Sequence, residues 1–385
     1  MNDIYLDNAS STMPYPEVTE RVCQVLGSQY GNAHSVHYKG MEAFRIISRS
    51  AETIANILGC DPTELVFTSG GTESNNLAVK GYAFANRGRG RHILTTEYEH
   101  ASVRQSLESL RKFDFEPGYI PIGPDKSPDI AVLGDRIRKD TILTSMVMVN
   151  SETGSMLDIA KTAAAVKKAN ARCAFHTDAV QGFLKYEIRL DLLEQIDMMS
   201  FSAHKIRGPK GIGLLFVRKK TNLEGILSGG NHQNGLRAGT ENTPLIAGFA
   251  MACELTHARM KNNFMHVSNL KNHLLERLSP LSEQIMLLSP GDASPYILSV
   301  SFKGIKGEVL LNHLSSKGIC LSAGSACSSR TKVHSHVLEA MHVPKEFMEG
   351  AIRFSFNEMN TTVEIDAAVG EIMKILPGLQ AIRRK

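Results

Sequence analysis

Helix and strand patterns alternate along this 385-residue chain from about residue 42, and that alternation constrains its fold more than any other feature. Apolar residues first recur at steps of three and four, which predicts a helix. They are Phe44, Ile47, Ala51, Ile54 and Leu58. Gly59, followed by Asp61 and Pro62, predicts the end of that helix.

Short apolar segments follow, and each is predicted to be a buried strand. The predicted strands cover residues 64–70, 92–97, 141–150, 173–178, 197–204 and 211–217. Predicted helices at 72–86, 102–113 and 159–170 lie between them. Strands interleaved with helices predict a mostly parallel sheet with helices on both faces. Ligands of such sheets bind beyond the carboxyl ends of the strands.

The pattern changes near residue 256. A long helix is predicted to run to about residue 279 and to be followed by an α+β arrangement. Its parts are a strand at 295–302, a helix at 308–318, a strand at 351–357 and a final helix from about Thr362. We therefore predict a large domain over 15–255 and a smaller domain over 1–14 and 256–385.

Composition excludes several classes of function. The net charge of +4 is spread along the chain, which argues against nucleic-acid and membrane partners. No segment approaches the ~20 apolar residues that cross a bilayer, and the first residues, MNDIYLDNASST, do not resemble a signal peptide. Six cysteines are scattered without metal-type spacing, so we expect no metal site, reduced thiols and a cytoplasmic location.

Lys205 is the first candidate catalytic residue. A lysine at a turn is usually just solvated, but Lys205 directly follows an apolar strand in SFSAHKIRGPKGIG. Ser202 and His204 lie beside it, and the glycines after it let a ligand approach the backbone. A lysine held in this way suits a Schiff base with a carbonyl cofactor such as pyridoxal phosphate.

Pyridoxal phosphate makes two further demands that the sequence meets. Gly70, Gly71 and Thr72 lie between a strand and a helix, where backbone N–H groups can bind a phosphate. Asp178 follows another strand and could hold a proton on the pyridine nitrogen, with Gln181 near the phenolic oxygen. The alternative for Asp178 is a helix cap.

Two more residues belong to this set. The protein has no Trp, so His100, at another strand end, is the candidate to stack on a flat ring, although a lone His is usually only a satisfied polar group. Cys327 lies among Ser, Ala and Gly in CLSAGSACSSR. Structural cysteines usually have apolar neighbours, so we interpret Cys327 as a reactive thiol on a movable loop over about 322–332 rather than a buried inert one.

These segments together resemble the cysteine desulfurases, NifS- and IscS-like enzymes of the class V aminotransferase superfamily. The resemblance runs from YLDNASST through TSGGTESNN, EHASV, HTDAVQ, SFSAHKIRGPKGIG and RAGTEN to AIRFSFN. It implies the fold type I architecture of pyridoxal-phosphate enzymes. That architecture has a large domain with a mostly parallel seven-stranded sheet and a smaller α+β domain.

The resemblance also implies a role for each matching residue. Lys205 would carry the cofactor as an internal aldimine, with His100 stacked on the ring. The residues implied to hold the cofactor are Gly71, Thr72, Ser151, Asp178, Gln181, Ser202 and His204, with Thr240 reaching it across a homodimer interface. Arg353 and Asn150 would bind the substrate, because the fork of a guanidinium fits a carboxylate.

The implied reaction converts L-cysteine to L-alanine and leaves the sulfur on Cys327 as a persulfide. We expect His100 to take the proton of the Cys327 thiol, because a thiol of pKa ~8.5 is mostly protonated at neutral pH. The sulfur would pass to an acceptor protein, such as an iron–sulfur scaffold, a tRNA-thiolation enzyme or a nitrogenase-maturation protein. Cys327 is also a possible transient ligand of an iron–sulfur cluster.

Two departures from the family pattern leave other functions open. Ser151 replaces the second residue of the usual Asn-Asn-Glu, and residues 229–233 read GGNHQ where the family has GGGxE. One alternative is another class V enzyme, such as a selenocysteine lyase, kynureninase or aminotransferase. The other is a non-catalytic scaffold built on the same fold.

Overall fold

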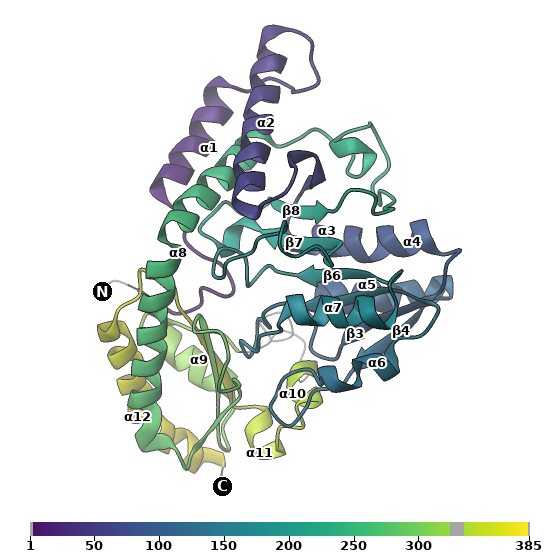
Figure 1. Ribbon diagram of the computed structural model, residues 1–385. Coiled ribbons are helices and arrows are strands. Elements are labelled where there is room, and N and C mark those ends of the chain that lie inside the picture. Colours follow the sequence, from purple (N-terminus) through teal and green to yellow (C-terminus); the bar gives the residue numbers. More distant parts are fainter. Residues whose placement is uncertain (1–2, 324–334, 384–385) are drawn as a thin grey trace.

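A seven-stranded sheet forms the centre of the molecule. The computed structural model describes residues 3–323 and 335–383 (Figure 1). The strands lie in the order β2-β8-β7-β6-β5-β3-β4. Their bounds are β2 (Leu65–Thr68), β3 (His92–Thr96), β4 (Glu116–Ile120), β5 (Thr141–Val147), β6 (Ala174–Asp178), β7 (Met198–Ser202) and β8 (Gly213–Val217). Neighbouring strands are parallel except at β8, which is antiparallel to both β2 and β7. The sheet is therefore mostly parallel with seven strands, which confirms the predicted fold class.

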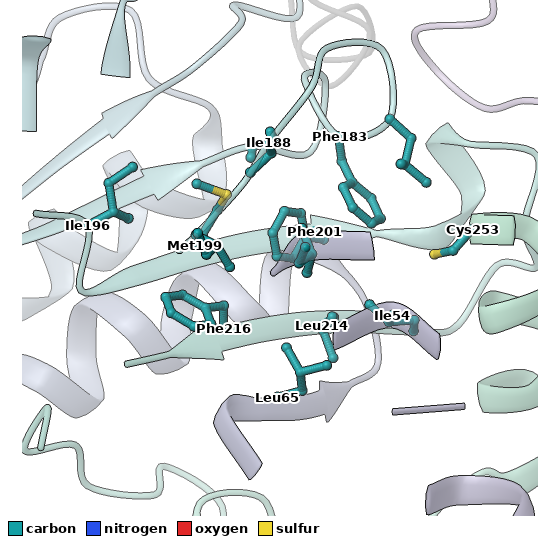
Figure 2. Packing of buried hydrophobic residues seen from close by; sticks show 14 of the residues in the cluster. Ile54, Leu65, Phe183, Ile188, Ile196, Met199, Phe201, Leu214, Phe216 and Cys253 are labelled. Carbon is teal, nitrogen blue, oxygen red and sulfur yellow. The ribbon is translucent and has the colours of Figure 1, made fainter. Parts of the chain in front are cut away.

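Helices cover both faces of this sheet. Alternate residues of each strand point to opposite faces, so Leu65 and Phe67 pack in one cluster and Val66 in another. The first face is covered by α2 (Tyr38–Leu58), α7 (Ile159–Ala169) and the start of α8 (Thr243–Leu278). Figure 2 shows its packing around Met199, Phe201 and Phe216. The second face is covered by α4 (Tyr82–Asn86) and α5 (Ala101–Leu110).

Some predicted boundaries shift in the structure. The helix predicted at 72–86 consists of α3 (Gly71–Asn76), a π-helical segment (Leu77–Gly81) and α4. The helix predicted to end at Gly59 does so, with Gly59 in the left-handed conformation at φ 68°. The elements α1 (Pro16–Ser28), β4 and α6 (Leu133–Arg136) were not predicted.

A second hydrophobic cluster lies around a small antiparallel sheet of order β12-β10-β9. Its strands are β9 (Ile285–Leu287), β10 (Ile297–Phe302) and β12 (Ala351–Ser355). The helices nearby are α9 (Gly307–Ser316), α10 (His336–Ala340), α11 (Lys345–Met348) and α12 (Thr362–Arg383). The single helix α8 contributes to both clusters, Phe249 to the first and Leu270 to the second (Figure 1). The domain boundary near residue 256 stays a prediction.

The N-terminal segment links the two clusters. Strand β1 (Ile4–Tyr5) pairs in parallel with β11 (Ile319–Cys320), and Asn8 Nδ2 donates to the backbone oxygen of Ser355 at 3.0 Å. A few residues later, Thr12 N donates to the backbone oxygen of His204 at 2.9 Å. The segment therefore crosses the region where the candidate residues meet.

In the described ranges, no helix is long and apolar enough to cross a membrane.

Candidate active site

The predicted residues lie at one edge of the central sheet. Lys205 follows β7, Asp178 ends β6, Asn150 follows β5 and His100 follows β3. These strands are parallel, so their carboxyl ends meet at the same edge. The Gly70–Gly71 turn follows β2, which has the same direction as β7 because β8 is antiparallel to both. The structure thus brings these residues together.

Lys205 ends a short 3-10 turn, Ala203–Lys205, that directly follows β7. Its Nζ donates to the backbone oxygens of Ala9 at 2.6 Å and Ser10 at 2.8 Å. Both acceptors belong to the N-terminal segment, which carries no candidate residue in the sequence analysis. The segment therefore fixes the position of the amine at the sheet edge.

Asp178 is buried, with 4% of its surface exposed, and two donors hold its carboxylate. Asn75 Nδ2 donates to Oδ2 at 2.7 Å, and the backbone N of Val180 donates to Oδ1 at 3.0 Å. No α-helix begins directly after Asp178, so the helix-cap alternative is wrong. Asn75 also donates to Ser102 Oγ at 2.8 Å. The sequence reasoning missed Asn75, although it lies four residues after Gly71 and so on the same helix face.

The glycine turn after β2 has the shape of a phosphate site. Gly70 has φ 155° at the N-cap of α3, a conformation that favours glycine. A Cβ on Gly71 would lie 2.7 Å from Val180 Cγ2, so only glycine lets the turn approach the Asp178 strand this closely. The first N–H groups of a helix have no partner within it and suit an anion. The donor set here, including exposed Thr72, therefore fits a cofactor phosphate.

Ser202 lies next to this turn, since a Cβ on Gly71 would be 3.6 Å from Ser202 Cβ, and His204 follows two residues later. Ser202 is buried at the end of β7, and His204 Nδ1 lies 3.3 Å from Ser11 Oγ. Burial lowers the pKa of His204 to about 4, and the positive charge of Lys205 acts in the same direction. His204 is therefore neutral at pH 7, and it can offer a hydrogen bond to a phosphate but no positive charge.

His100 caps the N-terminus of α5. Its Nδ1 accepts from the backbone N of Ser102 at 3.2 Å and lies 2.7 Å from Ser102 Oγ. Burial lowers its pKa, with Asp178 opposing and Lys205 reinforcing the shift. Because Nδ1 accepts, the neutral ring carries its proton on Nε2. To take a thiol proton at Nε2, the ring must first move its own proton to Nδ1, against the Ser102 contacts. Although protein surrounds most of the ring, the residue as a whole keeps exposed surface, as stacking on a cofactor requires.

Arg353 lies on β12 with 3% of its surface exposed. Its Nη1 donates to the backbone oxygen of Ser151 at 2.7 Å, and Nη2 donates to Asp7 Oδ1 at 2.8 Å and Ser10 Oγ at 2.6 Å. Its Nε is buried and has no hydrogen-bond partner within the described ranges. Arg353 is thus an oriented, buried cation and not part of a surface ion pair. Asp7 and Ser10 were not predicted from the sequence.

The remaining predicted residues are placed less directly. Asn150 holds its own loop, since Nδ2 donates to the Tyr98 backbone at 2.7 Å and Oδ1 accepts from the backbone N of Glu152 at 2.9 Å. Gln181 Nε2 donates to the Ala9 backbone oxygen at 2.8 Å. Thr240 is exposed, and its predicted contact across a dimer stays a prediction. Cys327 and most of its loop lie outside the described residues.

The departure at residues 229–233 has a local structural role. Gln233 Oε1 accepts from the backbone N of Phe67 in β2 at 2.8 Å, and Gln233 Nε2 contacts Glu241 Oε1. Glu241 also pairs with His34 at 3.3 Å.

Within residues 3–323 and 335–383, no group of three or more His, Cys, Asp or Glu side chains is arranged to hold a metal ion.

Comparison with known proteins bears directly on this site. The family model of the class-V aminotransferases matches residues 4–368. The chain belongs to the aminotransferase class-V family. All of the predicted site residues lie within the matched range. This membership confirms the resemblance that the sequence motifs indicated.

Individual known proteins are similar over nearly the whole chain. A cysteine desulfurase IscS of Dictyoglomus turgidum is 36% identical over 381 residues, which is 99% of this chain and 96% of that protein. A solved NifS-like protein superposes with a TM-score of 0.92 at 35% identity and covers 98% of this chain and 100% of its own. A structure of SspA in complex with cysteine has a TM-score of 0.81 at 30% identity, covering 91% and 98%.

Proposed function

We propose that this chain is a pyridoxal-phosphate-dependent cysteine desulfurase that converts L-cysteine to L-alanine. The observation that carries the proposal is the meeting of Lys205, Asp178 and the Gly71 turn at one sheet edge. The desulfurase names of the relatives in the same class-V family support it.

Each residue then has a part in holding the cofactor. Bound to Lys205 Nζ, pyridoxal phosphate supplies an electron sink for the substrate Cα. Asp178, fixed by Asn75 and the Val180 backbone, would hold a proton on the pyridine nitrogen. The first-turn N–H groups of α3 would bind the phosphate, together with Ser202 and neutral His204.

The substrate steps use other residues of this chain. Arg353, already oriented by Asp7 and Ser10, would bind the cysteine carboxylate. Lys205 Nζ, once released, would take the proton from Cα. The thiolate of Cys327 would attack the substrate sulfur, so an S–S bond forms as the Cβ–S bond breaks. The bonding electron pair stays with the substrate carbon, which is protonated and leaves as alanine, while Cys327 keeps the persulfide.

We further propose a homodimer and a protein acceptor for the sulfur. Large apolar side chains are exposed around the start of α2, including Val36 at 97% and Tyr38 at 76% exposure. A patch of this kind fits a protein interface. An iron–sulfur scaffold or a tRNA-thiolation enzyme would both serve as acceptor. The cytoplasmic location stays a prediction.

One substitution tests the reaction. With L-cysteine and dithiothreitol, the wild type should release sulfide and alanine in equal amounts, and Cys327→Ser should lose about 100-fold or more in rate, since the nucleophile is gone. Cys23→Ser, which alters an exposed cysteine on α1, is the control and should keep the wild-type rate. An undiminished rate in Cys327→Ser would overturn the proposal. Production of an amino acid only when a keto acid is added would identify an aminotransferase instead.

A further inference from the structure

We propose that Lys185 is a positioning residue that fixes the orientation of the Gln181 amide toward the cofactor. The inference rests on the proposed function, because it assumes that a pyridoxal cofactor binds at Lys205. Lys185 lies in the turn after β6, four residues beyond Gln181. Neither the sequence motifs nor the reaction described above gives it a role.

A chain of hydrogen bonds joins this lysine to the catalytic one. Lys185 Nζ donates to Gln181 Oε1 at 2.8 Å. Gln181 Nε2 donates to the backbone oxygen of Ala9 at 2.8 Å. The same Ala9 oxygen accepts from Lys205 Nζ at 2.6 Å. The Gln181 amide therefore lies between two lysine side chains.

Two contacts decide which end of the Gln181 amide faces Ala9, the Lys185 ammonium at one end and the Ala9 carbonyl at the other. An ammonium group can only donate, so it requires the oxygen of the amide. The Nε2 group must then point away from Lys185, toward Ala9 and the Lys205 side of the turn. Ala9 accepts one of its two hydrogens, and the second would be left for the phenolic oxygen of the cofactor. Without Lys185, only the Ala9 contact would hold the amide in this orientation, so its second N–H would be directed less firmly.

The backbone before Lys185 is held in an uncommon conformation. Leu184 has φ 53°, in the left-handed region that non-glycine residues rarely adopt. Such conformations persist where the surroundings determine them. Here Phe183, at 1% exposure, and Leu184, at 4%, are anchored in the large hydrophobic cluster (Figure 2). This anchoring turns the chain so that Lys185 reaches back to Gln181.

The surroundings of Lys185 are unfavourable for a cation. The Tyr296 ring, whose centre lies 5.2 Å from Nζ, offers a cation–π contact but no formal negative charge. Burial, reinforced by the nearby cations Lys205 and Arg353, lowers the pKa of Lys185 to about 7. No carboxylate contributes to that shift. A methionine would fill the same space without this cost, so simple packing does not explain the lysine.

The test uses the visible absorption band of the enzyme reconstituted with pyridoxal phosphate. In Lys185→Met, the pH midpoint of the band should rise by about one unit, because the Gln181 donor to the phenolic oxygen is no longer held in place. In a Gln181→Leu background, the same substitution should shift the midpoint by under about 0.3 units, because Lys185 acts through Gln181. Lys185→Arg, which keeps a donor, should stay near the wild-type midpoint.

Lys271→Met is the matched control. Lys271 is a buried lysine, 8% exposed, whereas Lys185 is partly buried, and Lys271 donates to the backbone oxygens of Ala293 and Ser294. Its replacement should leave the midpoint unchanged. An unshifted midpoint in Lys185→Met, or an equal shift with and without Gln181, overturns the inference while leaving the desulfurase proposal intact. Loss of the band in Lys185→Met but not in Lys205→Ala would overturn both, since Lys185 would then hold the cofactor.

Discussion

Glu99 precedes His100 and is buried, with 1% of its surface exposed. Its Oε1 accepts from the backbone N of Val147 at 3.0 Å, while Oε2 is buried without a hydrogen-bond partner in the part of the chain described. Burial raises its pKa to about 8, and the charge of Asp178 adds to the shift. Glu99 is therefore protonated at neutral pH, and it does not place a second negative charge beside Asp178.

This shift predicts a dependence of stability on pH. Between the ordinary pKa of 4.5 and the folded value of about 8, the folded protein binds a proton that the unfolded chain has released. The contribution of Glu99 is therefore fully present below 4.5 and is lost as the pH rises through 8. Glu99→Gln should make the free energy of unfolding fall less steeply from pH 5 to 8, as measured by urea denaturation. Glu97→Gln, two residues earlier, should keep the wild-type slope, and equal slopes in all three proteins would contradict the expectation.

Arg353 provides a prediction about substrate binding. Arg353→Lys keeps the charge but loses the fork that fits a carboxylate. We expect KM for L-cysteine to rise about tenfold or more, with a smaller change in kcat, because the lost contact acts mainly in binding. Arg138→Lys, at a surface ion pair with Asp140, should leave both constants unchanged. A fall in kcat with an unchanged KM would argue against a role in carboxylate binding.

At the scale of elements, the turn that begins α3 is the most demanding part of the site. Gly71→Ala would place a Cβ 2.7 Å from Val180 Cγ2 in the turn after β6. We expect the affinity for pyridoxal phosphate to fall about tenfold or more, measured by fluorescence titration of the apoenzyme, because the turn must move away from the phosphate. Gly88→Ala, where no atom lies within 4 Å of the new Cβ, is the control. Equal affinity in both variants would show that the close approach is not needed.

The central elements were predictable because their apolar pattern is continuous over four to seven residues. Strand β4 was not, since Pro117 and Gly118 interrupt it and it lies at the sheet edge. Proline is tolerated there because an edge strand needs fewer hydrogen bonds. Strand β1 is only two residues long and depends on a partner at Ile319–Cys320, more than 300 positions away. Local pattern contains no information about such a pairing.

The site residues also divide into those that a local sequence pattern predicts and those that depend on distant contacts. Lys205, Asp178 and the glycine turn were predictable because each lies at or just after the end of a strand. The contacts of Asp7, Ser10 and Lys185 were not, because they depend on how turns fold back over the sheet.

For the whole molecule, the exposed apolar patch around the start of α2 predicts the oligomeric state. It includes Tyr30, Val36, Tyr38 and Phe44, each at least 59% exposed. The wild type should sediment as a dimer of the 42.2 kDa chain, and the double variant Val36→Asp, Phe44→Asp as a monomer, because buried charges at an interface are costly. If Thr240 reaches the partner's cofactor, the monomer should also bind pyridoxal phosphate more weakly. A dimer that survives both substitutions would place the interface elsewhere.

The N-terminal segment also affects when the site can form during synthesis. Ala9 and Ser10 hold Lys205, while Asn8 is fixed by Ser355, which lies 347 positions later. The segment that holds Lys205 thus depends on β12, the last strand that the structure describes. A nascent chain cannot complete the pocket around Lys205 before β12 has been synthesised, so cofactor capture follows translation of that strand.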